Sequence, residues 1–389
     1  MEYRPLGTMV KRKIGYGIVQ PGQSISDGVP VIKVNNLISG LKDVKDLDTT
    51  SPENESKYVR TRLNGGELIV SVVGTIGKTA IVPKSFAGCN LVRATALIDI
   101  EDELLAMWVK YYIDSPDGQS YIAQNLNTTV QPTLNIKSLV DMPIPIFEKD
   151  AMTGVVKMLQ ALDRKIECNK KINDNLFEQM QAIYKAWFVD FEPFGGEKPN
   201  EWIKSDIYSL ANIIYGAPFA SKKFNTAGEG KPIIRIRDLK DQQFATYTTE
   251  IHPKGYLLKP GDLVVGMDGE FRPYIWGNDE AWLNQRVCVF DNKRPNGKAF
   301  LYYTIKPLLY AIEQTQVATT VIHIGKKDYD AFEVYLPDDK VLDAFDSLTT
   351  PMVQSIVSNN FENKRLAALR DILLPKLMSG EIDVSDIQL

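Results

Sequence analysis

The chain has 389 residues and a formal net charge of −4 at pH 7, with 44% hydrophobic and 24% charged residues. This length exceeds one ordinary core and predicts two or three domains, and no apolar run approaches the roughly 18 residues of a membrane-spanning helix. The three cysteines stand far apart, which excludes a disulfide framework or a cysteine-rich zinc site. The first residues contain no apolar signal segment, so we expect a cytoplasmic protein.

The first 147 residues have the pattern of a β-rich block. The pair Tyr16-Gly17 is followed by a loop and by the turn Gly28-Val29-Pro30, after which alternating residues predict a strand as far as Leu37, with Lys33 on one face. Residues 66–70 predict a turn into a buried strand. A helix is expected near the middle of the block, at residues 103–113.

Residues 191–337 repeat this pattern in the same order. The matching segments are Tyr215-Gly216, Gly230-Lys231-Pro232, a turn and strand at 261–265, a helix at 300–314, residues 318–324 (matching 128–135) and residues 335–337 (matching 142–145). Internal repetition of this kind is stronger evidence than any single motif. The chain is therefore predicted to contain two copies of one structural unit.

A long heptad pattern follows each block. In residues 155–187 apolar positions alternate spacings of four and three, interrupted by Asn169 and Asn173. Adding 190 to each number gives a second, rougher seam at 345–377, with Asn359 and Asn363 at the matching places. A buried asparagine weakens an apolar seam but fixes its register, because a misaligned neighbour leaves the amide unpaired. We therefore expect the two segments to pack on each other, with these asparagines as helix-register residues.

These patterns predict an α+β fold in which two similar globular β-rich domains are each followed by a long helix. A helix of about 40 residues would measure roughly 60 Å. The predicted boundaries are 1–147 for the first domain, 148–190 for the central helix, 191–337 for the linker and second domain, 338–380 for the C-terminal helix and 381–389 for the tail. The tail is acidic and is expected to fold back over the surface.

Enzymatic motifs are weak in this sequence. The segment Gly74-Thr75-Ile76-Gly77-Lys78-Thr79 ends like a phosphate-binding P-loop, but Val72 stands where the motif needs glycine, and a strand pattern follows instead of a helix. A tight turn, or a loop that lets Lys78 approach a phosphate or base edge, are the two other interpretations. His252 and His323 have no plausible nucleophile or metal partners and are interpreted as structural. We expect no catalytic residue, no metal and no cofactor bound by this chain.

Basic and amide side chains recur at matching places in the two blocks. Arginine and lysine contact phosphates and guanine, while asparagine and glutamine pair with adenine in the major groove. The candidate DNA-binding residues are Lys11, Arg12, Lys13, Lys33, Asn35, Arg60, Arg62, Lys78, Thr79, Lys222, Lys223, Arg235, Arg237, Arg272, Gln285 and Arg286. The net charge does not decide whether the chain binds DNA, because nine acidic and five basic residues in 338–389 account for the whole charge of −4.

Four motifs occur in an order that points to a known family. They are Val73-Gly74-Thr75-Ile76-Gly77-Lys78, Gln131-Pro132-Thr133-Leu134-Asn135-Ile136, Leu162-Asp163-Arg164-Lys165-Ile166 and Leu373-Leu374-Pro375-Lys376-Leu377-Met378. With these motifs the chain resembles the specificity (S) subunits of type I restriction–modification systems over nearly its whole length. The second block departs from the pattern, because it lacks the Gly-Thr-x-Gly-Lys turn and the Gln-Pro-Thr segment.

The resemblance implies that each globular block is a target recognition domain for one half of a bipartite, asymmetric site in double-stranded DNA. It implies an antiparallel coiled coil that sets the spacer, and two methyltransferase subunits that dock on the helices. Those subunits would methylate adenine N6 with S-adenosylmethionine, and restriction subunits would cleave unmodified DNA in host defence.

Two other function classes remain open from the residues themselves. One is a non-enzymatic, two-domain coiled-coil adaptor that does not bind DNA. Duplex binding that weakens with salt is expected of an S subunit and not of such an adaptor. The other is an enzyme with a cryptic site, which predicts methylation or cleavage by the purified chain alone.

Overall fold

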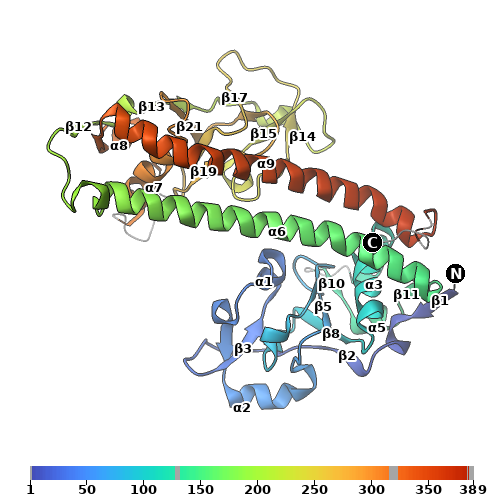
Figure 1. Cartoon of the computed structure of the whole chain (residues 1–389). Helices are drawn as coiled ribbons and strands as arrows, with labels where there is room; N and C mark the ends of the chain where they lie inside the picture. Colours follow the sequence, from blue (N-terminus) through green and yellow to red (C-terminus); the bar gives the residue numbers. More distant parts are fainter. Residues whose placement is uncertain (1, 128–131, 315–322, 383, 385–389) are drawn as a thin grey trace. The chain divides into compact units, whose positions relative to one another are not determined.

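The computed structural model describes residues 2–127, 132–314, 323–382 and 384, and the chain divides into two compact units (Figure 1). Unit 1 comprises Met1–Arg164 with Leu366–Leu389, and unit 2 comprises Lys165–Arg365. The helices α6 (Lys149–Phe188) and α9 (Asp339–Met378), each of 40 residues, contribute to both units. Most of the predicted tail, and part of the predicted match between 128–135 and 318–324, lie outside the described residues.

The centre of unit 1 is a four-stranded antiparallel sheet with a three-stranded sheet beside it. The larger sheet has the order β2 (Arg12–Tyr16), β8 (Thr95–Asp99), β5 (Leu68–Ser71) and β6 (Thr79–Ile81). The smaller sheet has the order β4 (Asp48–Thr50), β3 (Val29–Ile32) and β7 (Asn90–Leu91), and only β3 and β7 are parallel. Two further pairs are β1 (Glu2–Pro5) with β11 (Pro143–Ile146) and β9 (Leu126–Asn127) with β10 (Thr133–Leu134).

Strand β5 is apolar along most of its length because both of its faces are covered. Leu68 and Val70 belong to the main hydrophobic cluster of unit 1, whereas Ile69 belongs to a second cluster with Ile32 and Leu91. Successive side chains of a strand point to opposite faces, so one strand supplies both clusters. This explains why the predicted buried strand at 66–70 shows no polar alternation.

Helix α3 (Glu103–Asp114) joins the first domain to the long helices. It begins after Asp102, whose carboxylate accepts a hydrogen bond from the backbone N–H of Leu105 at 3.1 Å. Its buried residues, Trp108 among them, share a cluster with Leu159 of α6 and Leu377 of α9. The predicted helix at 103–113 is confirmed. The other helices of this domain are α1 (Val34–Ser39), α2 (Pro52–Glu55), α4 (Pro116–Gln124) and α5 (Ile136–Val140).

Unit 2 repeats the topology of unit 1. Its four-stranded sheet has the order β13 (Ala211–Tyr215), β21 (Val287–Asn292), β18 (Leu263–Gly266) and β19 (Pro273–Ile275). Its five-stranded sheet has the order β14 (Phe224–Asn225), β16 (Tyr247–Thr248), β15 (Lys231–Ile234), β20 (Ala281–Leu283) and β17 (Leu257–Leu258). The pair β12 (Ile203–Asp206) with β22 (Glu333–Leu336) and the helices α7 (Lys298–Gln314) and α8 (Lys326–Tyr329) complete the domain.

The predicted repeat is confirmed by close contacts at two equivalent glycines. A Cβ atom at Gly17 would lie 2.1 Å from the carbonyl oxygen of Leu91, and one at Gly216 would lie 2.0 Å from that of Asn284. In both copies the residue after the glycine forms a parallel bridge, Ile18 to Val92 and Ala217 to Asn284. The two tyrosine–glycine pairs therefore match because only glycine lets these two segments approach so closely.

The long alternating strands that we predicted after the two Gly-x-Pro turns are wrong in their second half. Strands β3 and β15 end one residue before Lys33 and Arg235, and helical turns begin there. The side chain of Asn36 accepts from the N–H of Lys33 at 2.7 Å, and that of Asp238 accepts from the N–H of Arg235 at 3.0 Å. These side-chain acceptors bind the backbone locally and end the strand.

Helices α6 and α9 lie side by side and run antiparallel (Figure 1). In unit 2, Asn169 contacts Asn363 while Asn173, further along α6, contacts Asn360, which lies earlier in α9. In unit 1, Leu159 near the start of α6 and Leu377 near the end of α9 belong to one hydrophobic cluster, as an antiparallel pair requires. The predicted fold class, with two β-rich domains and an antiparallel helix pair, is confirmed.

Candidate nucleic-acid interface

Arg12 lies inside unit 1, with only 26% of its side chain exposed. Its guanidinium donates to Glu67 at 2.7 Å and to the carbonyl oxygen of Arg62 at 2.8 Å, and it also pairs with Asp99. A guanidinium engaged in this way has few donors left for a base or a phosphate. The geometry therefore favours a structural role for Arg12 instead of the DNA contact expected from the sequence.

Arg62 is held in a comparable way. It donates from Nε to the carboxylate of Glu55 at 2.8 Å and makes a second contact through Nη2, which gives a two-point pair. The Glu55 side chain is 2% exposed and also accepts from Asn90 at 3.0 Å. Hydrogen bonding to Arg62 holds the pKa of Glu55 below its usual value. This pair ties α2 to the loop that follows it.

Arg235 and Arg272 are two more of the predicted arginines that pair with carboxylates of their own domain. Arg235 donates to Asp238 at 3.2 Å and contacts Thr246, and Arg272 donates to Glu313 at 3.0 Å. The sequence could not separate these arginines from exposed ones, because their partners are distant in the chain or belong to turns predicted as strand. For both residues the contacts favour a structural role over the expected contact with DNA.

Ten of the remaining predicted residues are exposed to solvent, and Lys33 and Thr79 are half-buried. The exposed ones are Lys11, Lys13, Asn35, Arg60, Lys78, Lys222, Lys223, Arg237, Gln285 and Arg286. Lys33 pairs with Asp48, and Thr79 donates to Asp114 at 2.6 Å. Several of the exposed residues also form ion pairs, such as Lys11 with Glu101 and Arg237 with Asp238, but their side chains face solvent, and the exposed set remains the candidate interface.

One end of each four-stranded sheet gathers several of these residues. In unit 1 the hairpin between β5 and β6 carries Lys78, and the neighbouring turn before β8 carries Arg93, which was not among the residues predicted from the sequence. Arg93 donates its N–H to Ile18 at 2.8 Å just as Gln285 donates its N–H to Ala217 at 2.9 Å. Arg93 could thus have been found from the repeat, since it occupies the position of Gln285.

The glycine-rich hairpin does not form a nucleotide-binding loop. Gly74 and Gly77 have φ values of 78° and 82°, and β6 follows directly as an antiparallel strand. A P-loop would place a helix N-terminus there to bind phosphate. Among the described residues no group of three or more His, Cys, Asp or Glu side chains could hold a metal ion. No described helix is both long and apolar enough to cross a membrane.

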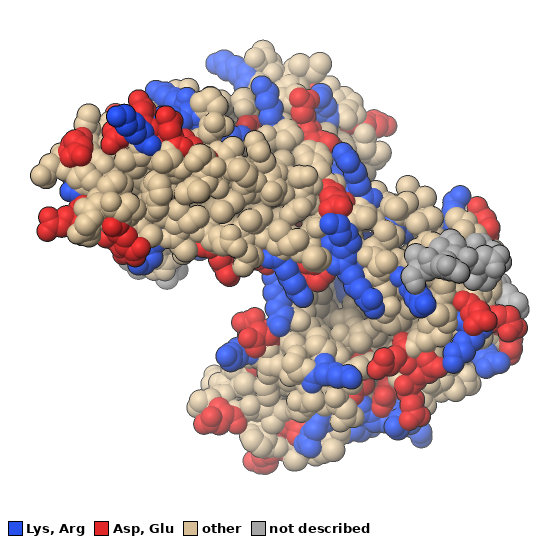
Figure 2. Space-filling view, viewed as in Figure 1, with Lys and Arg blue, Asp and Glu red and all other residues tan. Residues whose placement is uncertain are grey.

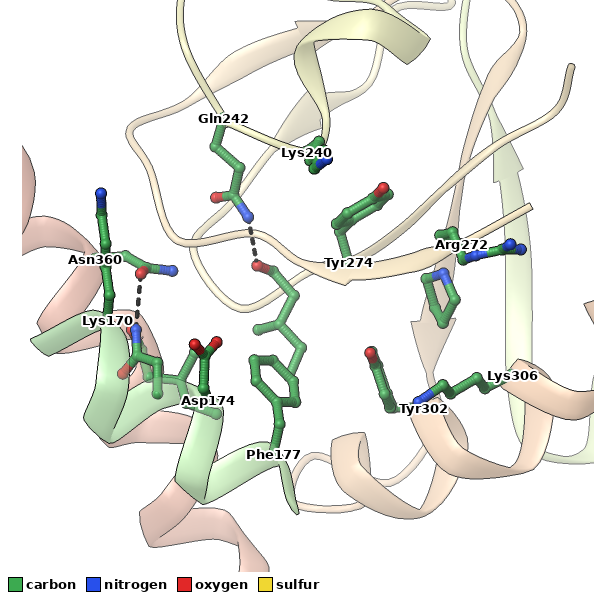
Figure 3. Close-up of a pocket in the computed structure, with 14 residues that line it drawn as sticks. Lys170, Asp174, Phe177, Lys240, Gln242, Arg272, Tyr274, Tyr302, Lys306 and Asn360 are labelled. Atoms are coloured by element: carbon green, nitrogen blue, oxygen red, sulfur yellow. Dashed lines mark hydrogen bonds between the residues drawn. The ribbon is translucent and has the colours of Figure 1, made fainter. Parts of the chain in front are cut away.

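A pocket of about 520 Å³ lies in unit 2 between α6, α7, β19 and the loop around residue 240 (Figure 3). Lys170, Lys240, Arg272 and Lys306 line it, with Asp174 and three aromatic rings. Burial, together with the nearby Arg272, lowers the pKa of Lys306 below its usual value. The pocket concentrates positive charge, and it could not be predicted from the sequence because its residues come from five separate segments, α9 among them.

The helix pair of unit 2 presents a different kind of surface. Residues 347–361 of α9 contain no Lys, Arg, Asp or Glu. Figure 2 shows this face as a broad uncharged area with charged side chains towards its edges. Leu348 of this segment is 48% exposed. An uncharged helix face with an exposed apolar side chain is typical of protein–protein contact surfaces.

The sequence profile of the type I restriction modification DNA specificity domain matches residues 21–178 and again residues 199–352. The chain belongs to this family. It carries two DNA specificity domains, each matched region extending from a β-rich domain into the long helix that follows it. The repeat found in the sequence is therefore a repeat of that domain.

Several specificity subunits are similar to this chain, in agreement with the family assignment. The specificity subunit of the type I restriction enzyme EcoBI from Escherichia coli is 38% identical over 129 residues, which cover 33% of this chain and 27% of that protein. The MjaIX specificity subunit from Methanocaldococcus jannaschii is 23% identical over 314 residues, 74% of this chain and 71% of that one. The crystal structure of the S subunit from M. genitalium has a TM-score of 0.54 at 13% identity, covering 96% and 95% of the two chains, and shows the shared fold.

Proposed function

We propose that this chain is the DNA specificity subunit of a type I restriction–modification complex and recognises a bipartite, asymmetric site. The observation that carries the proposal is the pair of DNA specificity domains built on one repeated topology. Equivalent loops of the two copies hold different side chains, such as Arg93 in one and Gln285 in the other. Two unlike domains on a common frame would bind two unlike half-sites.

DNA contact in this proposal falls to the exposed candidate residues, not to the four internally paired arginines. Solvent-exposed lysines such as Lys78 and Lys222 can neutralise phosphates and release condensed counterions. Side chains at the ends of the four-stranded sheets, such as Gln285 and Arg286, can reach base edges. Affinity would then depend on salt, and sequence preference on the sheet-end residues.

The long helices would serve as the scaffold of the complex. The uncharged face of α9 at residues 347–361, with the exposed Leu348, fits a protein partner better than a nucleic acid. In the proposed assembly two methyltransferase subunits dock on the helices and bind S-adenosylmethionine, and restriction subunits join them. The chain itself would be non-catalytic, and the asparagine pairs would set the register of the helices.

The test uses the full chain co-purified with its methyltransferase subunit. We expect tight, salt-dependent binding to duplexes that contain one bipartite motif, and adenine methylation within that motif only when both subunits are present. Exchanging residues 1–147 for the corresponding domain of another family member should change one half of the motif. A change in both halves, or in neither, would contradict the modular recognition.

The adaptor alternative makes a different prediction. If the chain only joins proteins, the complex should bind duplex DNA no better than the methyltransferase subunit alone, even at low salt. Methylation or cleavage by the purified chain without any partner would instead indicate an unrecognised catalytic site and would refute the non-catalytic role.

A further inference from the structure

The end of the four-stranded sheet in unit 1 is defined by a small set of backbone contacts. The N–H of Val72 donates to the carbonyl oxygen of Ala94 at 2.8 Å, and the carbonyl oxygen of Val72 accepts from the N–H of Leu134 at 2.9 Å. Next to these bonds, Val73 and Thr133 form an antiparallel bridge. Three segments that are distant in the sequence therefore meet at this point.

Unit 2 contains the same contacts with the same lengths. The N–H of Met267 donates to Arg286 at 2.8 Å, and the carbonyl oxygen of Met267 accepts from Ile324 at 2.9 Å. Asp268 and His323 form the matching antiparallel bridge. The equivalent positions are Val73 and Asp268, Ala94 and Arg286, and Thr133 and His323.

The side chains at these positions differ in chemistry between the two units. In unit 2 the carboxylate of Asp268 lies 2.6 Å from Nδ1 of His323 and 3.9 Å from Nη1 of Arg286. The side chains of Arg286 and His323 are 55% and 53% exposed, whereas that of Asp268 is 23% exposed. A partly buried carboxylate thus lies beside a cation and an imidazole at the surface. The unit 1 positions carry valine, alanine and threonine.

The fold does not require this charged cluster. Unit 1 forms the same backbone contacts with neutral side chains, so neither the sheet nor the bridge depends on charge. Arg286 has a φ of 68°, in the left-handed region that side chains other than glycine adopt at a cost in strain. An exposed arginine with a strained backbone, beside a partly buried carboxylate, is typical of a binding residue.

We propose that Arg286, oriented by Asp268 and His323, recognises a guanine in the half-site bound by the second specificity domain. The inference rests on the proposed function. Arginine donates two parallel hydrogen bonds to O6 and N7 of guanine, the commonest specific base contact. Asp268 lies 3.9 Å from Nη1 of Arg286, beyond hydrogen-bond distance, so it attracts the guanidinium electrostatically without occupying its donors.

The carboxylate also favours a base over a phosphate. Asp268 would repel a phosphate brought against Arg286, whereas the edge of guanine presents neutral acceptors. The first domain has Ala94 at this position and cannot form the same contact. The cluster thus accounts for one specific difference between the two half-sites.

The test compares complexes of the full chain and its methyltransferase partner, using duplexes that vary one base pair at a time and maps of methylated adenine. For the unchanged chain we expect a guanine preference at one position of the second half-site. Arg286→Ala should weaken binding to the preferred duplex by about 5- to 150-fold and remove the preference at that position only. Arg286→Lys keeps the charge but loses the two-point geometry, so it should lose the preference while keeping the dependence on salt.

Two further variants make the result decisive. Arg286→Gly removes the guanidinium and suits the positive φ, so it should fold as stably as the unchanged chain and still lose the preference. Lys204→Ala removes a cation of similar exposure, 54%, that pairs with Glu333 away from the sheet end, and it should leave the motif unchanged.

The possible outcomes separate this inference from the proposed function. If the unchanged complex is sequence-specific and Arg286→Gly keeps every base preference, the inference is overturned while the proposed function stands. Equal weakening on all duplexes would make Arg286 a phosphate contact and would also overturn it. If the unchanged complex binds no duplex specifically, both the proposed function and this inference fail.

Discussion

The side-chain amide of Asn169 in α6 donates a hydrogen bond to Oδ1 of Asn363 in α9 at 3.0 Å. Asn359 donates to Asn173 at 2.8 Å, and this is the same contact with the two helices exchanged. Matching asparagines of the two repeats are 190 residues apart, and the antiparallel packing pairs the first asparagine of each repeat with the second of the other. The two layers give the helix pair a local two-fold arrangement within unit 2.

We expect the Asn169–Asn363 pair to show direct energetic coupling. A double-mutant cycle with alanine at both positions, measured by denaturant unfolding of the full chain, should give a coupling free energy of about 1 kcal/mol. Asn169 is fully buried, so water cannot replace the hydrogen bond that the substitution removes. The control cycle pairs Asn169 with Asn175, an exposed residue of the same helix. Equal coupling in both cycles would argue against a specific register contact.

The close approach of Gly17 to Leu91 should make Gly17→Ala strongly destabilising. The added Cβ would lie 2.1 Å from a carbonyl oxygen, so a backbone segment must shift, and we expect a loss of about 3 kcal/mol in the free energy of unfolding. Gly22→Ala is the control, because Gly22 has a φ of 76° but open space around it. That change should cost only about 1 kcal/mol. Similar losses for both variants would show that space at Gly17 is not limiting.

Glu55→Gln should destabilise the protein in a manner that depends on pH. The pKa of Glu55 is lowered by its hydrogen bonds to Arg62, so the charged pair stabilises the fold above the usual glutamate pKa. This stabilisation disappears as the pH falls through the lowered pKa. At pH 7 we expect a loss of about 2 kcal/mol relative to the unchanged chain, and the difference should shrink in acid.

The matched control for that experiment is Glu53→Gln, since Glu53 lies exposed on the same short helix. Its effect on the free energy of unfolding should stay within about 0.5 kcal/mol. A difference between Glu55→Gln and the unchanged chain that grows towards low pH would contradict the assigned sign.

Asp163 should contribute more to the free energy of unfolding than Asp371, which pairs with the same arginine, Arg370. Asp163 accepts from the hydroxyl of Tyr111 at 2.8 Å and from Arg370 at 2.9 Å, joining α3, α6 and α9. Asp371 pairs with the same arginine but is 66% exposed. Thermal and denaturant unfolding should show a loss of about 2 kcal/mol for Asp163→Ala and under about 0.5 kcal/mol for Asp371→Ala. A larger loss for Asp371→Ala than for Asp163→Ala would contradict the role of Asp163 in joining the three helices.

Lys222→Ala should weaken DNA binding by the complex without changing its preferred sequence. Lys222 is exposed on the second domain, and the loss of one phosphate contact should reduce the slope of log K against log salt by about 0.9. Binding isotherms at several salt concentrations measure this slope, with Lys204→Ala as the control. An altered base preference would instead place Lys222 at a base edge.

The repeat and the long helices could be predicted from the sequence because the patterns that indicate them are short and local. Heptad spacing predicts the two 40-residue helices, and Gly17 and Gly216 mark a turn that only glycine permits. The asparagine positions predicted the pairing of the helices. The strands after the Gly-x-Pro turns were overextended, because the capping side chains Asn36 and Asp238 look like ordinary polar residues in an alternating pattern.

The roles of individual charged residues depended on the tertiary structure. Arg12 and Arg286 look alike in the sequence, yet Arg12 meets Glu67 and Asp99 because β2, β8 and β5 are neighbours in the sheet, while Arg286 emerges at the end of the equivalent sheet in unit 2. Sequence spacing determines which face of one element a residue occupies. Which distant carboxylate lies opposite it is decided only when the strands come together, and that pairing separates a structural arginine from one available to DNA.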